Sequence, residues 1–287
     1  NTNYSKNMFK ENISGILEME ECGLNSTWLK ELILEKTEDY FNTKVIRKLE
    51  KIIQPHYLGI DESQISMNND VEEKTILFNH RDNGYTGWNW FWKRIDELRE
   101  KRQDFKVYTT LADPPKELIK NKEGKDELVD REYAVRVDIH DRDEYLKFIG
   151  KMTVGVGCFQ TYSAWSISTT DGLSQGVPYV LPNKLCYPEM LGDDYPLLYG
   201  DKDDFLKKIE NLLDNPNERR KCNKHISKKI NSFSWAERVP KWFDGWKFLD
   251  NMKMIGPDSE AYKKIYEFIK ENGHVTKNDI TEYLNWG

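Results

Sequence analysis

The chain is poor in the residues from which metal centres and disulfide frameworks are built. Among its 287 residues are five histidines and four cysteines, and the cysteines lie far apart, at Cys22, Cys158, Cys186 and Cys222. No Cys-x-x-Cys pair and no His-Glu-x-x-His motif occurs. These absences argue against a zinc site and a disulfide-stapled fold, and they fit a reducing compartment. We therefore expect a cytoplasmic protein that needs no metal.

Long apolar runs and an excess of positive charge are also missing. No apolar stretch approaches the roughly 18 residues of a membrane span, and no signal peptide is visible. The net charge of −6 excludes a surface coated with positive charge, although it allows a local basic patch. No P-loop, Gly-x-Ser-x-Gly motif or internal repeat appears. Because the sequence begins with Asn1 rather than Met, we expect a fragment or a processed product.

The sequence pattern divides into four zones. Residues 1–61 are mostly helical in pattern, with apolar stripes through 28–34 and 45–53, and Asn25-Ser26-Thr27 supplies a helix N-cap. Residues 62–73 are polar and acidic without periodicity, which predicts a linker. Residues 74–250 are expected to form the main domain, and residues 251–287 a small helical tail.

Short apolar strands alternate with helices in the main domain. Strands are predicted at 75–78, 105–110, 133–139, 152–157 and 177–181, and helices at 88–100, 143–149, 205–213, 218–230 and 235–250. This alternation predicts an α/β fold with a Rossmann-like, doubly wound parallel sheet. Such a sheet binds ligands at the carboxyl ends of its strands.

The most informative stretch runs from Lys151 to Asn183. Its strand ends in glycine at Gly157, which lets a ligand or a neighbouring backbone come close. A polar loop and a short helical turn follow, with Asp171 near the start of the turn and Gly176-Val177-Pro178 after it. This order resembles the nucleotide-sugar site of retaining GT-B glycosyltransferases, in which an acidic residue five positions before Gly-Val-Pro holds the donor ribose.

The resemblance implies roles for single residues. Asp171 would accept hydrogen bonds from two ribose hydroxyls, and Ser163 stands eight positions earlier, where many members carry a second acid. Arg81, just after the first strand, matches an arginine that binds the donor diphosphate and would stabilise the leaving group. The lysine that commonly follows in the family is missing, because Tyr85-Thr86-Gly87 occupies its place, and Lys93 lies too far along the helix to fill the role.

Four further residues complete the expected donor site. His140 follows the third strand, where members of the family meet the nucleotide base. Gly157 and Thr170 belong to the loop and helix start whose backbone amides and hydroxyls can hold phosphate, and Gly172 follows Asp171 directly.

Several of these residues also have simpler interpretations that the sequence leaves open. Arg81 would pair with Asp82 on the surface, Asp171 would serve as the helix N-cap, and His140 would close a turn. The acidic pairs Asp193-Asp194 and Asp203-Asp204 are interpreted as solvated helix starts rather than cation sites.

The tail suggests an acceptor. Two short helices around Glu271-Asn272-Gly273-His274 resemble the start of a helix-turn-helix module. With this tail, the chain resembles bacteriophage glycosyltransferases that decorate modified DNA bases, which implies DNA as the acceptor. A tail that only packs against the enzyme is the alternative.

The resemblance implies transfer of a sugar from a nucleoside diphosphate sugar, a UDP-sugar in particular, without a further cofactor. The sheet would be the C-terminal donor domain, and residues 1–61 only the end of an N-terminal acceptor domain, which a partner chain would complete. Two other functions stay open, a non-catalytic nucleotide-binding or scaffold module and a sugar-nucleotide epimerase of the same architecture. A flavodoxin-like signalling domain is disfavoured, because His80-Arg81 stands where its acidic cluster would be.

Overall fold

The structure, a computed structural model, describes residues 13, 22–24, 27–39, 41–55, 57–67, 71–239, 267 and 271. The contacts divide the chain into two compact units, Gln64–Ile230 and a second made of Asn1–Ser63 with Asn231–Gly287. The domain boundaries expected from the sequence stay predictions. The aromatic segment after residue 239 and nearly all of the tail lie outside the described residues.

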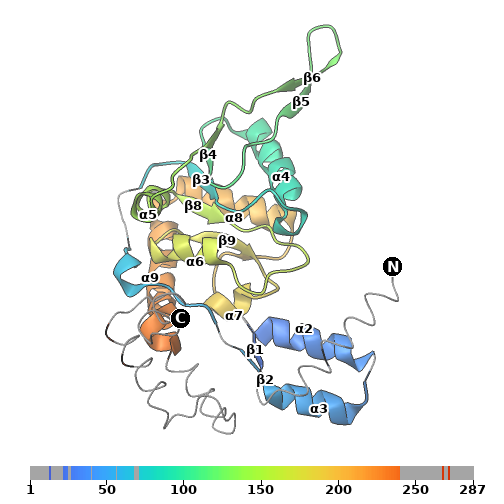
Figure 1. Cartoon of the computed structure of the whole chain (residues 1–287). Helices are drawn as coiled ribbons and strands as arrows, with labels where there is room; N and C mark the ends of the chain where they lie inside the picture. Colours follow the sequence, from blue (N-terminus) through green and yellow to red (C-terminus); the bar gives the residue numbers. More distant parts are fainter. Residues whose placement is uncertain are drawn as a thin grey trace, which may run out of the picture. The chain divides into compact units, whose positions relative to one another are not determined.

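The larger unit is built on a six-stranded sheet in which every neighbouring pair is parallel. Its strand order is β10-β9-β8-β3-β4-β7 (Figure 1). The bounds are β3 Thr75–Phe78, β4 Lys106–Thr109, β7 Ala134–Arg136, β8 Val154–Val156, β9 Tyr179–Pro182 and β10 Leu198–Tyr199. The predicted Rossmann-like parallel sheet is therefore confirmed.

The central strands are apolar because both faces of the sheet are covered. All residues of β3, β8 and β9 are buried, as expected for a parallel sheet between two helix layers. The edge strand β7 is shorter than the predicted 133–139. Its last paired residue, Arg136, lies opposite Thr109, where β4 ends, so the chain beyond has little strand to pair with.

Helices cover both faces of this sheet. Successive β–α–β connections run in opposite directions from β3 and from β8, and right-handed crossovers place their helices on opposite faces. One layer pairs α4 (Trp88–Lys101) with α8 (Lys202–Asp214), and the other pairs α5 (Arg142–Ile149) with α6 (Ile167–Ser174). The connections also contain α7 (Tyr187–Leu191) and α9 (Pro216–Ile230), and α9 packs on α8 and α6.

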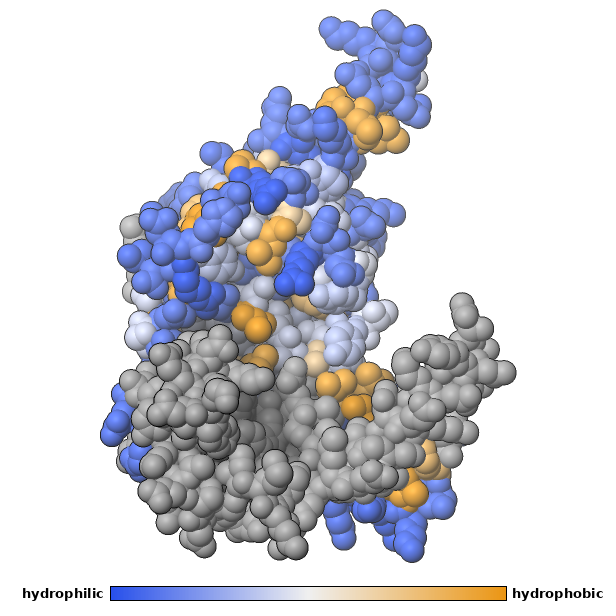
Figure 2. Space-filling model, viewed as in Figure 1, coloured by the Kyte–Doolittle hydropathy of each residue, from blue (hydrophilic) through white to orange (hydrophobic). Residues whose placement is uncertain are grey.

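A β-hairpin projects from the sheet unit and was not predicted. Its strands, β5 (Glu117–Lys120) and β6 (Asp126–Val129), pair antiparallel around a turn in which Asn121 accepts hydrogen bonds from two backbone amides (Figure 1). Leu118 and Leu128 face each other across the strands, and both are more than 60% exposed (63% and 61%). Figure 2 shows these apolar side chains among the polar ones of the hairpin.

The smaller unit confirms the two predicted helices and adds two short strands. The helices are α2 (Thr27–Glu38) and α3 (Thr43–Ile52), and β1 (Cys22–Leu24) pairs in parallel with β2 (Ile53–Pro55). Asn42 caps α3 by accepting from two amides, whereas Asn25 and Ser26 of the predicted N-cap lie outside the described residues. The core joins Ile13, Leu49 and Ile53. Three short 3-10 turns, Glu62–Gln64, Gly84–Thr86 and Asn231–Phe233, complete the elements.

Candidate functional site

The strand order reverses direction between β3 and β8. From β3 the chain moves outward through β4 to β7, and from β8 it moves the other way through β9 to β10. Open α/β sheets bind ligands outside the carboxyl ends of the two strands at such a switch point. The predicted residues Arg81 and Gly157 follow these two strands directly. The topology therefore brings together two parts of the predicted donor site that are more than seventy positions apart in the sequence.

His80 closes the switch point. Its Nε2 lies 3.1 Å from the carbonyl oxygen of Val156, and its ring meets Phe78 and Phe159 edge-on. Burial lowers the pKa of His80 to about 4, so the ring is neutral near pH 7. The sequence gave no role to this histidine, which here ties the end of β3 to the end of β8.

Arg81 is exposed next to this buried histidine. In the described part of the chain its guanidinium makes no hydrogen bond or ion pair, so the predicted pairing with Asp82 is not found. Its backbone is fixed instead, because the carbonyl oxygen of Arg81 accepts from the Thr86 hydroxyl (2.8 Å) and from the Asn83 amide (2.9 Å). An unpaired cation on a fixed turn is available to an anionic ligand.

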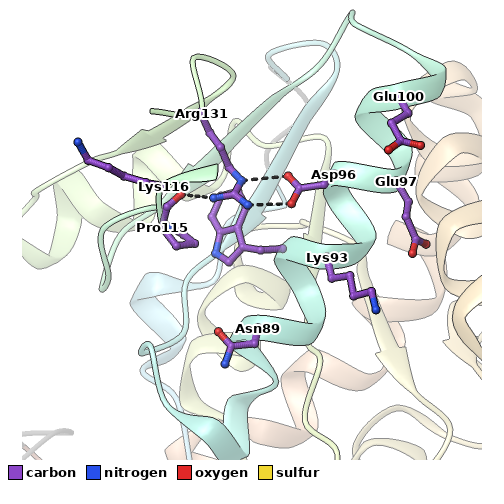
Figure 3. Close-up of a pocket in the computed structure, with 9 residues that line it drawn as sticks. Asn89, Lys93, Asp96, Glu97, Glu100, Pro115, Lys116 and Arg131 are labelled. Carbon is purple, nitrogen blue, oxygen red and sulfur yellow. Dashed lines mark hydrogen bonds and ion pairs between the residues drawn. The ribbon is translucent and has the colours of Figure 1, made fainter. Parts of the chain in front are cut away.

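The turn after Arg81 carries no second cation. Thr86 is 2% exposed, and its hydroxyl is committed to this turn. Gly87 has φ 75°, and a Cβ there would overlap the carbonyl of Cys158, so a glycine is required before α4. Lys93 lies on α4 in another pocket of about 520 Å³, beside the Asp96–Arg131 ion pair (Figure 3). It thus lies away from the carboxyl edge, as the sequence indicated.

Asp171 lies inside α6 rather than at its start. The N-cap is Ser166, whose hydroxyl accepts from the Thr169 amide, so the interpretation of Asp171 as an N-cap is wrong. The Asp171 side chain is 6% exposed, and both of its oxygens accept from Arg142, at 2.6 and 2.8 Å. This bidentate hydrogen bonding raises the pKa of Arg142.

Sequence reasoning missed Arg142, although a signal for it exists. Arg142 is the first residue of α5, where the helix dipole disfavours a cation unless a partner offsets it. Asp171 is that partner, and Gln64 adds a longer contact to the guanidinium at 3.3 Å. The carboxylate keeps lone pairs beyond the two that Arg142 uses, so hydrogen bonding from a ligand hydroxyl remains chemically open to it.

Asn79 was also missed and joins the elements around Asp171. It is fully buried at the carboxyl end of β3, and its amide nitrogen donates to the Tyr145 hydroxyl (3.0 Å) and to the Ser168 carbonyl (2.8 Å). Its amide oxygen accepts from the Tyr179 hydroxyl at 3.0 Å. One side chain therefore fixes β3, α5, α6 and β9 relative to one another. Its signal in the sequence was an amide that ends an apolar strand.

Two of the predicted ligands are glycines with packing roles. A Cβ on Gly172 would overlap the ring of Tyr179, and one on Gly157 would lie 2.7 Å from Leu181 Cδ2. A neighbouring side chain, rather than a ligand or backbone, thus fills the space that each glycine leaves.

The remaining predicted ligands differ in exposure. Thr170 is 1% exposed and donates to the Ile167 carbonyl, and Ser163 is buried with its Oγ 3.4 Å from the Tyr187 hydroxyl. His140 is exposed and lies 3.8 Å from Asp138. The ligand roles of these residues and of both glycines stay predictions.

Three further observations bear on metals, membranes and cavities. No group of three histidine, cysteine or acidic side chains among the described residues could hold a metal ion. No helix within the same residues is long and apolar enough to cross a membrane. A small pocket of about 210 Å³ lies at the ends of β9 and β10, lined by residues that include Lys184 and Lys202.

Comparison with known proteins identifies relatives by structure alone. No protein-family model matches the chain, and no curated protein matches it. Among solved structures it is similar to *Staphylococcus aureus* TarM in complex with UDP (TM-score 0.59, 13% identity) and to pneumococcal GtfA in complex with UDP and GlcNAc (0.63, 10%). It is also similar to a glycosyltransferase from Rickettsia africae (0.63, 12%).

These matches cover most of this chain but only part of the other proteins. They include 82%, 85% and 85% of its length, against 45% of TarM, 48% of GtfA and 68% of the Rickettsia protein. The chain thus spans about half the length of the first two. At such low identities the likeness concerns the fold, and it confirms the predicted GT-B architecture.

Proposed function

We propose that this chain is the donor-binding part of a glycosyltransferase that takes its sugar from a nucleoside diphosphate sugar, with a UDP-sugar favoured. One observation carries the proposal: Arg81 is an exposed, unpaired cation beside the switch point between β3 and β8. Two solved structures of similar fold are complexes with UDP, which favours uridine. The neighbours are far larger, so the activity of the whole protein is part of the proposal.

The chemistry assigns distinct tasks to two residues. In the transfer, the bond from the anomeric carbon to the β-phosphate oxygen breaks, and an acceptor atom bonds to that carbon as it loses its proton. The departing diphosphate gains negative charge, which the Arg81 guanidinium would stabilise. Asp171 would accept hydrogen bonds from the ribose hydroxyls through the lone pairs that Arg142 leaves free.

Calorimetry with UDP tests the donor site. We expect micromolar binding that Arg81→Gln weakens by about tenfold, which corresponds to about 1.4 kcal/mol. Arg220→Gln is the matched control, since Arg220 is exposed and lines a pocket with Lys74 and Thr153, which precede β3 and β8 at the opposite edge of the sheet. Absence of binding to UDP, GDP and ADP, or equal losses in both variants, would count against the donor site.

A second titration isolates Asp171. If its carboxylate accepts from the ribose, UDP should bind more tightly than 2′-deoxy-UDP, and Asp171→Asn should remove most of this difference. A preference that Asp171→Asn leaves intact would show that another residue holds the ribose.

We further propose DNA, through a modified base, as the acceptor. The support is the helix-turn-helix resemblance of residues 257–287, nearly all of which lie outside the described residues. Removal of residues 257–287 should reduce retention of the protein on DNA. Incubation with UDP-sugars and hydroxymethylated DNA, with UDP release as readout, tests transfer. Unchanged retention and no UDP release would contradict this acceptor.

One observation favours a second candidate, nucleotide binding without catalysis. Ser163, at the position of an expected acid, is buried and offers no charge, and both oxygens of Asp171 already serve Arg142. A non-catalytic module, completed by a partner chain, would bind UDP with the ribose preference above, yet release no UDP from any UDP-sugar. UDP release above the uncatalysed rate excludes this candidate.

A further inference from the structure

The helix α9 carries an unusual charge for this protein. The whole chain has a net charge of −6, yet the fifteen residues of α9 contain six lysines and arginines and a single acid, Glu218. The basic residues are Arg219, Arg220, Lys221, Lys224, Lys228 and Lys229. A local excess of this size is independent of the donor site.

Burial separates the one structural cation of α9 from the rest. Arg219 is 5% exposed and faces inward, where it donates to the backbone carbonyls of Met152 and Gly176. Beyond the first turn, all exposed side chains of α9 except Ser227 are cationic. We call the row of Arg220, Lys224 and Lys228 the basic face of α9.

Helix stability does not account for the basic face. Lys228 lies in the last turn, where a cation suits the helix dipole, but Arg220 and Lys224 lie farther towards the N-terminus. Like charges four residues apart repel, so Arg220, Lys224 and Lys228 weaken the helix. Among the described acids, none forms an ion pair with Lys224 or Lys228, and Glu218 pairs with Lys221.

The spacing of the basic face matches a regular polyanion. At a rise of about 1.5 Å per residue, the three cations extend over about 12 Å along the helix. This length corresponds to three or four nucleotide steps of about 3.4 Å along one DNA strand. A lipid surface is a poorer match, because the apolar side chains of α9 (Cys222, Ile226 and Ile230) are buried in the fold and cannot enter a bilayer.

We propose that the basic face of α9 binds the phosphate backbone of a nucleic acid. The contacts are electrostatic and independent of base sequence, so they hold the polymer on the protein without selecting a site. This inference does not depend on the donor site, and it would hold for a protein that transfers no sugar.

The test measures binding of the full chain to a labelled 20-base-pair DNA duplex by fluorescence anisotropy between 50 and 200 mM salt. Each phosphate contact contributes about 0.9 to the slope of log K against log salt concentration. The triple variant Arg220→Gln, Lys224→Gln, Lys228→Gln should therefore lower the magnitude of that slope by about 2 to 3. Thermal unfolding of each variant checks that the fold is intact.

A matched control separates local contacts from total charge. The variant Lys116→Gln, Lys122→Gln, Lys125→Gln removes the same number of charges from exposed positions on or beside the β5–β6 hairpin, where acids alternate with lysines. We expect its slope to equal that of the unmodified protein. Arg220→Lys, which keeps the charge, should also bind normally.

Three results would overturn the proposal. They are no binding of the unmodified protein at 50 mM salt, an equal loss in the two triple variants, and an unchanged slope in the α9 variant. Binding to phosphatidylserine vesicles that depends on α9, without binding to the duplex, would assign the basic face to a membrane surface instead.

Discussion

At the residue scale, the candidate site depends on polar groups that are buried but satisfied. His80 and Asn79 end the same strand, and each bridges β3 to another element through a hydrogen bond. Asp171 and Arg142 form the charged counterpart of these bridges. Such groups stabilise one arrangement of the site, because breaking any of the bonds would leave a buried polar atom without a partner.

His80 should make stability depend on pH. Its pKa is 6.5 as a free side chain and about 4 when folded, so between these values the unfolded chain binds the extra proton. The contribution is fully present above pH 6.5 and falls as the pH drops towards 4, by about 3 kcal/mol in total. Urea unfolding of the unmodified protein and of His80→Gln at pH 7.5 and 5 should show a smaller loss for the variant. His140→Gln, at an exposed histidine, should keep the full pH dependence, and an equal loss for His80→Gln would contradict this account.

The ion pair between Arg142 and Asp171 should behave as one unit. Arg142→Ala leaves a buried carboxylate without its partner, and because Arg142 is about half exposed we expect a loss of about 1–3 kcal/mol. The double variant with Asp171→Ala should lose less than the sum of the single variants. Denaturant unfolding of the four proteins measures this coupling, and strictly additive losses would mean that the pair contributes nothing of its own.

At the element scale, the position of α6 on the sheet is set by glycine and tyrosine. The ring of Tyr179, in β9, fills the space above Gly155 in β8 and Gly172 in α6. This packing brings α6 close to β8 and β9, and thereby fixes where Asp171 lies relative to the carboxyl edge. The sequence motif that suggested a ribose-binding acid thus includes a glycine that the helix needs for its position.

Replacement of Gly172 should reverse the usual effect of alanine in a helix. Alanine normally stabilises a helix relative to glycine by about 1 kcal/mol. Here its Cβ would overlap Tyr179, so we expect a net loss of about 1–3 kcal/mol in denaturant unfolding. Gly84→Ala is the matched control, since nothing lies within 4 Å of a Cβ at that position. A stabilised Gly172→Ala protein would show that the ring moves away at no cost.

At the scale of the whole molecule, charge and topology divide the work. The sheet brings the ends of β3 and β8 together at one edge, and the positive charge is concentrated on α9 although the chain is acidic overall. The solved structures of similar fold are longer proteins, so a complete activity involves more chain than is present here.

Donor binding should therefore appear first as stabilisation. A ligand that binds only the folded state raises the free energy of unfolding by about 2.7 kcal/mol at a concentration of 100 times its Kd. We expect UDP to raise the Tm of the full chain in a concentration-dependent way, and 2′-deoxy-UDP to raise it less. Arg81→Gln should reduce the shift without changing the Tm in the absence of nucleotide. An equal shift with uridine, which lacks the diphosphate, would mean that no phosphate site exists.

The sequence by itself determined the class of fold and most elements of the sheet, because buried parallel strands are short apolar runs and the helices between them are amphipathic. It also singled out Arg81 and Asp171 from the pattern around the strand ends and Gly176-Val177-Pro178. The edge strands and the hairpin escaped it, since β10 has two residues and β5 and β6 are largely exposed.

Only the tertiary structure decided which groups meet. Arg142 and Asp171 are 29 positions apart, and His80 and Val156 are 76 apart, so no local periodicity links them. The packing of α5, α6 and the strands around the switch point brings these partners within hydrogen-bond distance. The same packing turns Arg219 inward and leaves the basic face of α9 exposed, which no count of charges along the sequence could distinguish.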